Sequence, residues 1–310
     1  GRSIASPREA ARFVSLIPAG EEERERRRGA AAMGNALAFE PTWAGAALVF
    51  AQGWASRLDH ATLLCSLLLG FNLDAWVVLG RDATGPHAWV AVRDSRRRAI
   101  FWESLTGRRY DTADPKAMRR CPYRAVGCAF NHRKFFASLA SSSLSPGEVD
   151  YRFEDPALWM GMDEGECAAL PPPPPLALRP PTADRAALEE AIESALRQRI
   201  AKARSDAGMR RTVWDLSLSY LLMPALASYE GEQITGASGG NEEFQMSIKR
   251  AVPRGYSFKA FPQQFTHTSA DRMLSRLLTS EMCADIIGCD DTDAKFALRA
   301  RCCCYPEDVF

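Results

Sequence analysis

The stretch "RLDHATLLCSLLLGFNLDAWVVLG", residues 57–80, decides the fold of this 310-residue chain. Its apolar first half predicts a buried helix over residues 59–70, and "AWVVLG" (75–80) predicts a strand. Two further strands are expected at "HAWVAV" (87–92) and "AIFWES" (99–104), which are short apolar runs with polar segments between them. A buried helix followed by an antiparallel meander predicts an α+β first domain.

The composition limits the kinds of partner. Lys and Arg number 39 and Asp and Glu 38, so the net charge of +1 creates no global field, and we expect neither nucleic acid nor a membrane as partner. No apolar run reaches the roughly 18 residues that span a bilayer. The nine cysteines form no CxxC pair and no cluster with histidine, which predicts reduced thiols in a cytoplasmic chain without metal or cofactor. The chain starts at Gly1 rather than Met, which suggests a piece of a longer protein.

A proline-rich segment divides the chain. "LPPPPPLALRPP" (170–181) must run extended, because proline locks φ and lacks an N–H. We therefore expect a first domain at residues 1–168, a proline-rich linker at 169–182 and a second domain at 183–310. The linker is expected to be a stiff spacer, and the alternative is a ligand for an SH3-type groove.

The remaining elements are predicted from periodicity and capping signals. In the first domain, helices are expected at 6–18, 42–55 and 131–140. The second domain is predicted to be α+β, with helices at 182–208, 212–230, 241–252 and 269–287, a loop at 231–240, and strands at 255–266 and 295–305. We expect a capping box of Thr212 and Asp215, a kink or break at Pro224, and Asn241 as an N-cap.

Two side chains of the meander are candidates for a catalytic site. A cysteine nucleophile requires a thiol at a helix N-terminus, a histidine on a neighbouring strand and an acid or amide that orients the histidine. His87 opens the second predicted strand and Glu103 lies near the end of the third, so the hairpin is expected to bring them together. These two residues fit the second and third members of such a triad.

The stretches "DHATLLCSLLLGFNLDAWVVLG", "PHAWV" and "FWESLTGRRY" resemble the transglutaminase-like, papain-related fold. More narrowly, the chain is similar to the 76-kDa centrosomal protein family, which is related to a dynein regulatory complex subunit of cilia. Other stretches that fit this family are "SPREAARFVSL" (6–16), "CPYRAVGCAFNH" (121–132), "LSYLLMPALASYE" (218–230), "NEEFQMSIKRAVPRGYSFKAFP" (241–262) and "YPE" (305–307). The family implies a C2 domain upstream of this fragment.

The resemblance implies that the nucleophile position is occupied by Arg57. In the transglutaminase-like pattern the cysteine lies four residues before the alanine that is Ala61 here, and a guanidinium is no nucleophile. Cys65 lies about 12 Å further along the helix in apolar surroundings and is expected to be core. Ser56 is turned by about 100° from the required direction, and His60 is expected to pack or hydrogen-bond at the helix start.

The favoured interpretation is therefore a catalytically inactive transglutaminase-like scaffold or assembly protein. A groove lined by Trp76, Trp89 and Trp102 could bind partners, and the alternative for these tryptophans is core packing. The resemblance implies a location in the cytoplasm and cytoskeleton, at the centrosome, centriole, basal body or ciliary axoneme. It also implies centriolar, axonemal or tubulin-associated partners and a role in limiting centriole duplication.

Two alternatives remain open at this stage. An active cysteine peptidase or transglutaminase could use Cys65, or another thiol such as Cys128, together with His87 and Glu103. A microtubule-binding module is a third interpretation, but the arginines are dispersed and matched by acidic residues.

Overall fold

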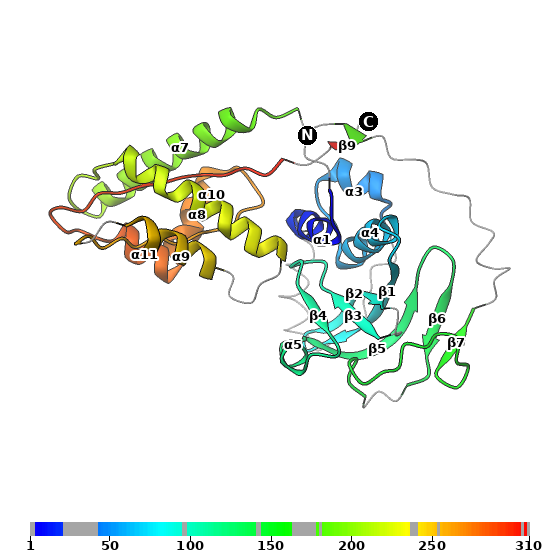
Figure 1. Cartoon of the computed structure of the whole chain (residues 1–310). Helices are drawn as coiled ribbons and strands as arrows, with labels where there is room; N and C mark the ends of the chain where they lie inside the picture. Colours follow the sequence, from blue (N-terminus) through cyan, green and yellow to red (C-terminus); the bar gives the residue numbers. More distant parts are fainter. Residues whose placement is uncertain are drawn as a thin grey trace. The chain divides into compact units, whose positions relative to one another are not determined.

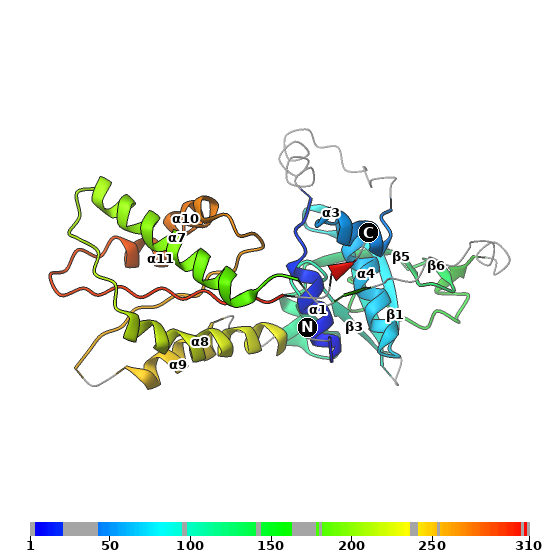
Figure 2. The same cartoon turned by 90° about the horizontal axis from the view of Figure 1, so that it is seen from above.

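The computed structural model describes most of the chain, which forms two compact units that divide near residue 180 (Figures 1 and 2). The first unit also includes residues 306–310. The structure describes residues 4–20, 43–94, 98–140, 144–162, 182–235, 241–252 and 255–304, together with the backbone of the short paired strands β8 (Leu178–Arg179) and β9 (Glu307–Asp308). The predicted linker at 169–182 lies almost entirely outside the described residues, so its role as spacer or ligand stays a prediction.

The first unit is built on a seven-stranded sheet of order β4-β3-β2-β1-β5-β6-β7, in which every neighbouring pair is antiparallel. The strands are β1 (Asp74–Asp82), β2 (Gly85–Arg93), β3 (Ala99–Trp102), β4 (Arg109–Asp111), β5 (Tyr123–Phe130), β6 (Phe135–Ser138) and β7 (Trp159–Gly161), with the short helix α5 (Pro115–Arg119) between β4 and β5. The three predicted strands are confirmed as β1, β2 and β3. The α+β fold class is confirmed as well.

Helix α4 (Arg57–Gly70) packs against β1 and β2, as predicted for the buried apolar helix. It begins at Ser56, whose side chain accepts the N–H of Asp59 while the Asp59 carboxylate accepts the N–H of Ser56. Helix α1 (Pro7–Leu16), capped by Ser6, and α3 (Ala46–Gln52) both contact α4 (Figure 1). The helices predicted at 6–18 and 42–55 are therefore confirmed.

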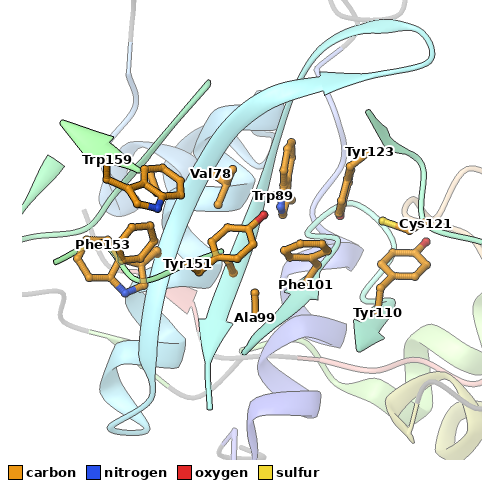
Figure 3. Packing of buried hydrophobic residues seen from close by; sticks show 13 residues of the cluster. Val78, Trp89, Ala99, Phe101, Tyr110, Cys121, Tyr123, Tyr151, Phe153 and Trp159 are labelled. Carbon is orange, nitrogen blue, oxygen red and sulfur yellow. The ribbon is translucent and has the colours of Figure 1, made fainter. Parts of the chain in front are cut away.

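An aromatic cluster fills the core of the sheet (Figure 3). The rings of Trp89 and Tyr123 stack face to face, with centroids 4.1 Å apart and an interplanar angle of 8°. Gly80 lies beside this stack, where a Cβ would come within 2.1 Å of the carbonyl oxygen of Ala125 and 2.6 Å of the Trp89 ring. A glycine on β1 is thus required for the strands to approach around the cluster.

The helix predicted at 131–140 is wrong, because this segment forms the second half of a hairpin and contains β6. The side-chain oxygen of Asn131 accepts the N–H groups of Arg133 and Lys134 and closes the turn. Phe136 then packs against the Trp76 ring, with centroids 5.6 Å apart. Packing into the aromatic core therefore stabilises a strand here, although the periodicity of the sequence indicates a helix.

The second unit consists of five helices within the described residues. They are α7 (Arg185–Asp206), α8 (Leu216–Thr235), α9 (Glu242–Ala251), α10 (Ala270–Thr279) and α11 (Glu281–Ile287). The predicted helices at 182–208 and 241–252 are confirmed, and Gly208 follows the first of these in the left-handed conformation with φ 74°. The helix predicted at 269–287 is divided at Ser280, and α8 extends over the first part of the predicted loop at 231–240.

Within the described residues 255–266 and 295–304, the predicted strands are not formed as paired strands. Only Phe296 makes an isolated bridge, with Trp214. The backbone N–H groups of Ala300 and Cys302 donate instead to the carboxylates of Glu193 and Glu189 on α7, at 3.0 and 2.8 Å. Because carboxylates satisfy these donors, the extended segment packs between helices without a strand neighbour.

Two predicted caps differ from those in the structure. Asp215 alone begins α8, because its carboxylate accepts the N–H groups of Ser217 and Leu218, and α8 continues through Pro224. Asn241 precedes α9 but makes no capping hydrogen bond. The buried carboxylate of Glu232 caps α9 instead, because it accepts the N–H groups of Glu242 and Glu243, both at 3.3 Å.

A buried arginine connects distant parts of the second unit. The Arg204 side chain at the end of α7 is 2% exposed. Its Nη1 donates to the carbonyl oxygens of Ile287 and Cys289, the latter at 2.8 Å, and its guanidinium lies 4.4 Å from the centroid of the Phe296 ring. The cation is thus compensated by backbone oxygens and by an aromatic face.

Candidate functional site

The predicted pair of His87 and Glu103 is formed. His87 Nε2 lies 2.7 Å from Glu103 Oε2, and both side chains are buried. Tyr123 donates its hydroxyl to the same oxygen at 3.1 Å, and the N–H of Leu105 donates to Glu103 Oε1 at 3.0 Å. Glu103 is therefore held by three partners in the orientation that directs its carboxylate at the imidazole.

A second carboxylate faces the other nitrogen of the imidazole. Asp82 Oδ2 lies 3.3 Å from His87 Nδ1, although this contact lacks hydrogen-bond geometry. Burial raises the pKa of Asp82, but hydrogen bonds from Thr84 and the charges of His87 and Arg57 outweigh it, so that the pKa falls below the usual 3.8. A cysteine nucleophile needs one imidazole nitrogen directed at the thiol, and here a carboxylate occupies that side.

Arg57 is the first residue of α4 and lies next to this cluster. Its Nη1 donates to the carbonyl oxygen of Pro86, the residue before His87, at 3.0 Å. The Arg57 guanidinium therefore links the start of α4 to the start of β2. Its positive charge also favours the ionised form of Asp82.

The two thiols considered as alternative nucleophiles, the buried Cys65 and the half-buried Cys128, lie in other environments. Burial raises the pKa of the Cys65 thiol to about 12, and the thiol hydrogen-bonds with the backbone of Val77. Val77 pairs with Val90, three residues beyond His87 and hence about 10 Å along the strand. Cys65 thus lies in the core away from the imidazole.

Cys128 lies nearer to His87 in the sheet but points elsewhere. It pairs with Leu79, which pairs with Ala88, so that these side chains occupy one face while His87 occupies the other. Burial also raises the pKa of the Cys128 thiol. Neither geometry nor ionisation favours it as a nucleophile.

Ser56 and His60 have structural roles at the start of α4. The Ser56 hydroxyl donates to Asp59 Oδ2 at 2.6 Å while accepting the Asp59 N–H. The ring nitrogens of His60 lie 2.7 Å from the carbonyl oxygen of Ser56 and 3.0 Å from that of Ile17. The prediction that His60 packs or hydrogen-bonds at the helix start is confirmed.

The three tryptophans predicted as a partner groove are buried. Trp89 and Trp102 are enclosed by the sheet, so core packing, the alternative for these residues, is the correct interpretation. Trp76 also belongs to the core cluster, although its edge lines a small cavity of about 260 Å³ beside Arg93. The Arg93 guanidinium already lies over the Trp76 ring, 5.4 Å from its centroid, so the three residues form no continuous aromatic groove.

Sequence reasoning missed two members of the cluster. Asp82 could have been found, because the hairpin register pairs Gly80 with His87 and places Asp82 two pairs nearer the turn, on the same face. Tyr123 lies on β5, a strand that was not predicted, and nothing near it in the sequence indicates its partner.

Among the described residues, no group of three His, Cys, Asp or Glu side chains is arranged to hold a metal ion. In the same part of the chain, no helix has the length and apolar character needed to cross a bilayer.

Comparison with known proteins assigns both units to the same protein family. A family model described as the CEP76 peptidase-like domain matches residues 41–162, and a model of the C-terminal domain of centrosomal protein of 76 kDa matches residues 181–310. The chain is 40% identical over 327 residues to the centrosomal protein of 76 kDa from Xenopus tropicalis, covering 99% of this chain and 47% of that protein. The human and Danio rerio proteins of this name are each 39% identical over 328 residues, covering 100% of this chain and 48% of theirs.

The helix, the antiparallel sheet and the His87–Glu103 pair thus define a peptidase-like domain. Together with its C-terminal domain, the chain belongs to the family of the centrosomal protein of 76 kDa. The chain spans about half the length of the curated relatives it matches.

Proposed function

We propose that this chain is part of a catalytically inactive, peptidase-like scaffold protein of the centrosome. The observation that carries the proposal is the position of Arg57, whose guanidinium hydrogen-bonds to the Pro86 carbonyl where a thiol would face His87. The contact of Asp82 with His87 Nδ1 and the raised pKa of Cys65 support it further. A site with these features retains the frame of a triad but has no group to attack a carbonyl.

The proposed location follows from the family name. The relatives are named centrosomal proteins, and we extend this location to the present chain, at the centriole or basal body. A role in limiting centriole duplication, a presence in the ciliary axoneme and partners among centriolar, axonemal or tubulin-associated proteins belong to the same proposal. The buried polar cluster would then serve to hold the strands of a binding domain in place.

The first experiment measures thiol-dependent peptide hydrolysis and amide transfer by the purified chain, beside His87→Ala and Cys65→Ala variants. We expect no turnover that depends on a thiol in any of the three proteins. Turnover by the unmodified chain that is lost in both variants would establish the alternative, an active cysteine peptidase or transglutaminase. The retained His87–Glu103 contact is the observation that makes this alternative worth the test.

The second experiment concerns location. The chain carrying a fluorescent tag is expressed in ciliated cells and compared with a centriolar marker and an axonemal marker. We expect a signal coincident with the centriolar marker. A uniformly cytoplasmic signal, for the full-length protein as well as for this chain, would contradict the proposed location.

A further inference from the structure

The segment from Arg108 to Arg124 carries an excess of positive charge. Its 17 residues include six basic and two acidic side chains, an excess of four positive charges, whereas the whole 310-residue chain has a net charge of +1. The rest of the chain is therefore net negative, and the balanced composition conceals one basic region. The segment comprises β4, α5 and the first residues of β5.

All six basic side chains of this segment are exposed, and five of them form a group that is here called the α5 patch. Helix α5 packs against β4 and leads directly into β5, so that the group lies at one end of these strands (Figure 1). The members of the α5 patch are Arg108, Lys116, Arg119, Arg120 and Arg124.

Buried neighbours connect the two ends of the α5 patch. Tyr110 interacts electrostatically with both Arg108 and Cys121, and Cys121 interacts in the same way with Arg124. The ring of Tyr110 also lies against that of Tyr123, with centroids 5.9 Å apart. The first and last members of the patch therefore adjoin the same buried groups.

A rigid base carries the α5 patch. Met118 packs against the aromatic cluster, and Cys121 is a buried member of it. Pro115 begins α5 and Pro122 follows it, so that the backbone torsion φ is fixed on both sides of the arginines. The cations thus project from a backbone that is already ordered, and a ligand that binds them does not have to order it.

The charges of the α5 patch are not compensated by acidic side chains. Among the described residues, no member of the patch forms an ion pair with an acid. The two acids of the segment are engaged elsewhere, because Asp111 pairs with Arg109 at 3.7 Å and Asp114 accepts the N–H of Lys116 at the start of α5. An anionic ligand would therefore meet five cations without an internal competitor.

The surroundings of the α5 patch favour an acidic protein segment over other polyanions. Four of its five members are arginines, whose guanidinium groups bind carboxylates in bidentate geometry. The neighbouring rings of Tyr110 and Tyr123 are buried, so they are not available to stack on nucleic-acid bases. Between Trp54 and Leu139, the described residues include no exposed large apolar side chain that would enter a lipid surface.

We propose that the α5 patch binds an acidic segment of a partner protein, a stretch rich in glutamate or aspartate. This binding goes beyond the proposed lack of catalytic activity and does not depend on it, because the patch takes no part in the His87–Glu103 contact. Exposed charges are screened by salt, so we expect a reversible complex whose affinity falls steeply with ionic strength.

The test is fluorescence anisotropy of a labelled peptide of about ten glutamates, titrated with the full chain in about 50 mM NaCl. We expect saturable binding that weakens at least about tenfold in about 300 mM NaCl. The double variant Arg119→Glu, Arg120→Glu should weaken binding at least about tenfold, because two attractive charges become repulsive. The double variant Arg119→Lys, Arg120→Lys keeps the charge and should bind within about threefold of the unmodified chain.

The matched control is the double variant Arg272→Glu, Arg276→Glu on α10. It makes the same change of charge at two exposed arginines of the second unit and should leave binding within about twofold of the unmodified chain. Thermal unfolding by circular dichroism checks that every variant is folded. Absence of saturable binding in about 50 mM NaCl, or equal weakening by the two arginine-to-glutamate variants, would overturn the proposal.

The same titration with two other anions tests the class of partner. The probes are an oligothymidylate with about ten phosphates and vesicles of phosphatidylcholine and phosphatidylserine. We expect both to bind more weakly than the glutamate peptide. Tighter binding of either probe that is lost in the Arg119→Glu, Arg120→Glu variant would overturn the assignment to an acidic protein segment.

Discussion

His87 Nε2 lies 2.7 Å from Glu103 Oε2 in the buried interior of the first unit, while Asp82 faces the opposite side of the imidazole. One imidazole between two carboxylates links β1 and β2, which carry Asp82 and His87, to Glu103, the residue that follows β3. The contacts among Asp82, His87 and Glu103 in this peptidase-like domain therefore contribute to the stability of the sheet.

Loss of the imidazole should destabilise the first unit. His87→Ala leaves the buried Glu103 carboxylate without its shortest hydrogen-bond contact, and we expect a loss of about 3 kcal/mol in the free energy of unfolding. Tyr123→Phe removes one hydroxyl donor from the same carboxylate and should cost about 1 kcal/mol. Urea unfolding followed by tryptophan fluorescence measures both. Arg152→Ala, which removes an exposed ion pair with Asp150, is the control and should change stability by less than about 0.5 kcal/mol.

A thiol placed at the start of α4 should be reactive without becoming catalytic. In Arg57→Cys, the N-terminus of α4 favours the thiolate, so alkylation by iodoacetamide at pH 7 should be at least about tenfold faster than that of Cys65. Mass spectrometry of digested protein measures the two rates separately. We expect no peptide hydrolysis, because Asp82 occupies the Nδ1 side of His87. Hydrolysis by this variant would show that the frame needs only a nucleophile.

The buried thiol of Cys65 should make stability depend on alkaline pH. Its pKa is about 12 in the folded chain against an ordinary value of 9.0, so between these values the unfolded chain loses a proton that the folded chain retains. Stability must then fall as pH rises above about 9, by up to about 1.4 kcal/mol per pH unit from this group. Urea titrations from pH 8 to 11 should show a shallower decline in Cys65→Ala than in the unmodified chain. Equal slopes would contradict the burial of an un-ionised thiol. Tyr123, whose pKa burial also raises, adds to the decline in both proteins.

Glu232 and Asn241 provide a direct comparison of the two possible caps of α9. Glu232→Ala removes the acceptor of two N–H groups at the start of the helix and should cost about 1–2 kcal/mol. Asn241→Ala should change stability by only a few tenths of a kcal/mol, since the Asn241 side chain makes no capping bond. Thermal unfolding of both variants measures the difference. A larger loss for Asn241→Ala would mean that the sequence-predicted cap is the effective one.

The elements that the sequence predicted well are those whose stabilising contacts are local. Helix α4 combines an apolar run with the capping box of Ser56 and Asp59, and the β1–β2 hairpin lies directly after it. The His87–Glu103 pair followed from this order, because adjacent antiparallel strands bring such positions together. The expectation that Arg57 lies next to the pair came from the resemblance to the transglutaminase-like pattern, and the hydrogen bond of Arg57 to the Pro86 carbonyl agrees with it.

The elements that the sequence predicted wrongly depend on distant partners. Phe136 on β6 packs against Trp76, sixty residues earlier, and this contact decides between strand and helix. The segment at 295–305 has the composition of a strand, but its N–H groups find carboxylates on α7 over one hundred residues away. Neither partner can be inferred from local periodicity. The predicted groove of tryptophans was wrong for the same reason. These side chains are buried because other elements cover both faces of the sheet, and local sequence does not reveal that coverage.

The contacts of Arg204 carry a consequence for any shortened form of the protein. Its acceptors at Ile287 and Cys289 lie 83 and 85 residues further along the chain. A premature stop codon before Ile287 would leave a buried guanidinium without both of these carbonyl oxygens, and a stop before Ala300 would remove one N–H donor from the buried Glu193 carboxylate. Inherited truncations in this region should therefore abolish the whole C-terminal unit and not merely trim its tail.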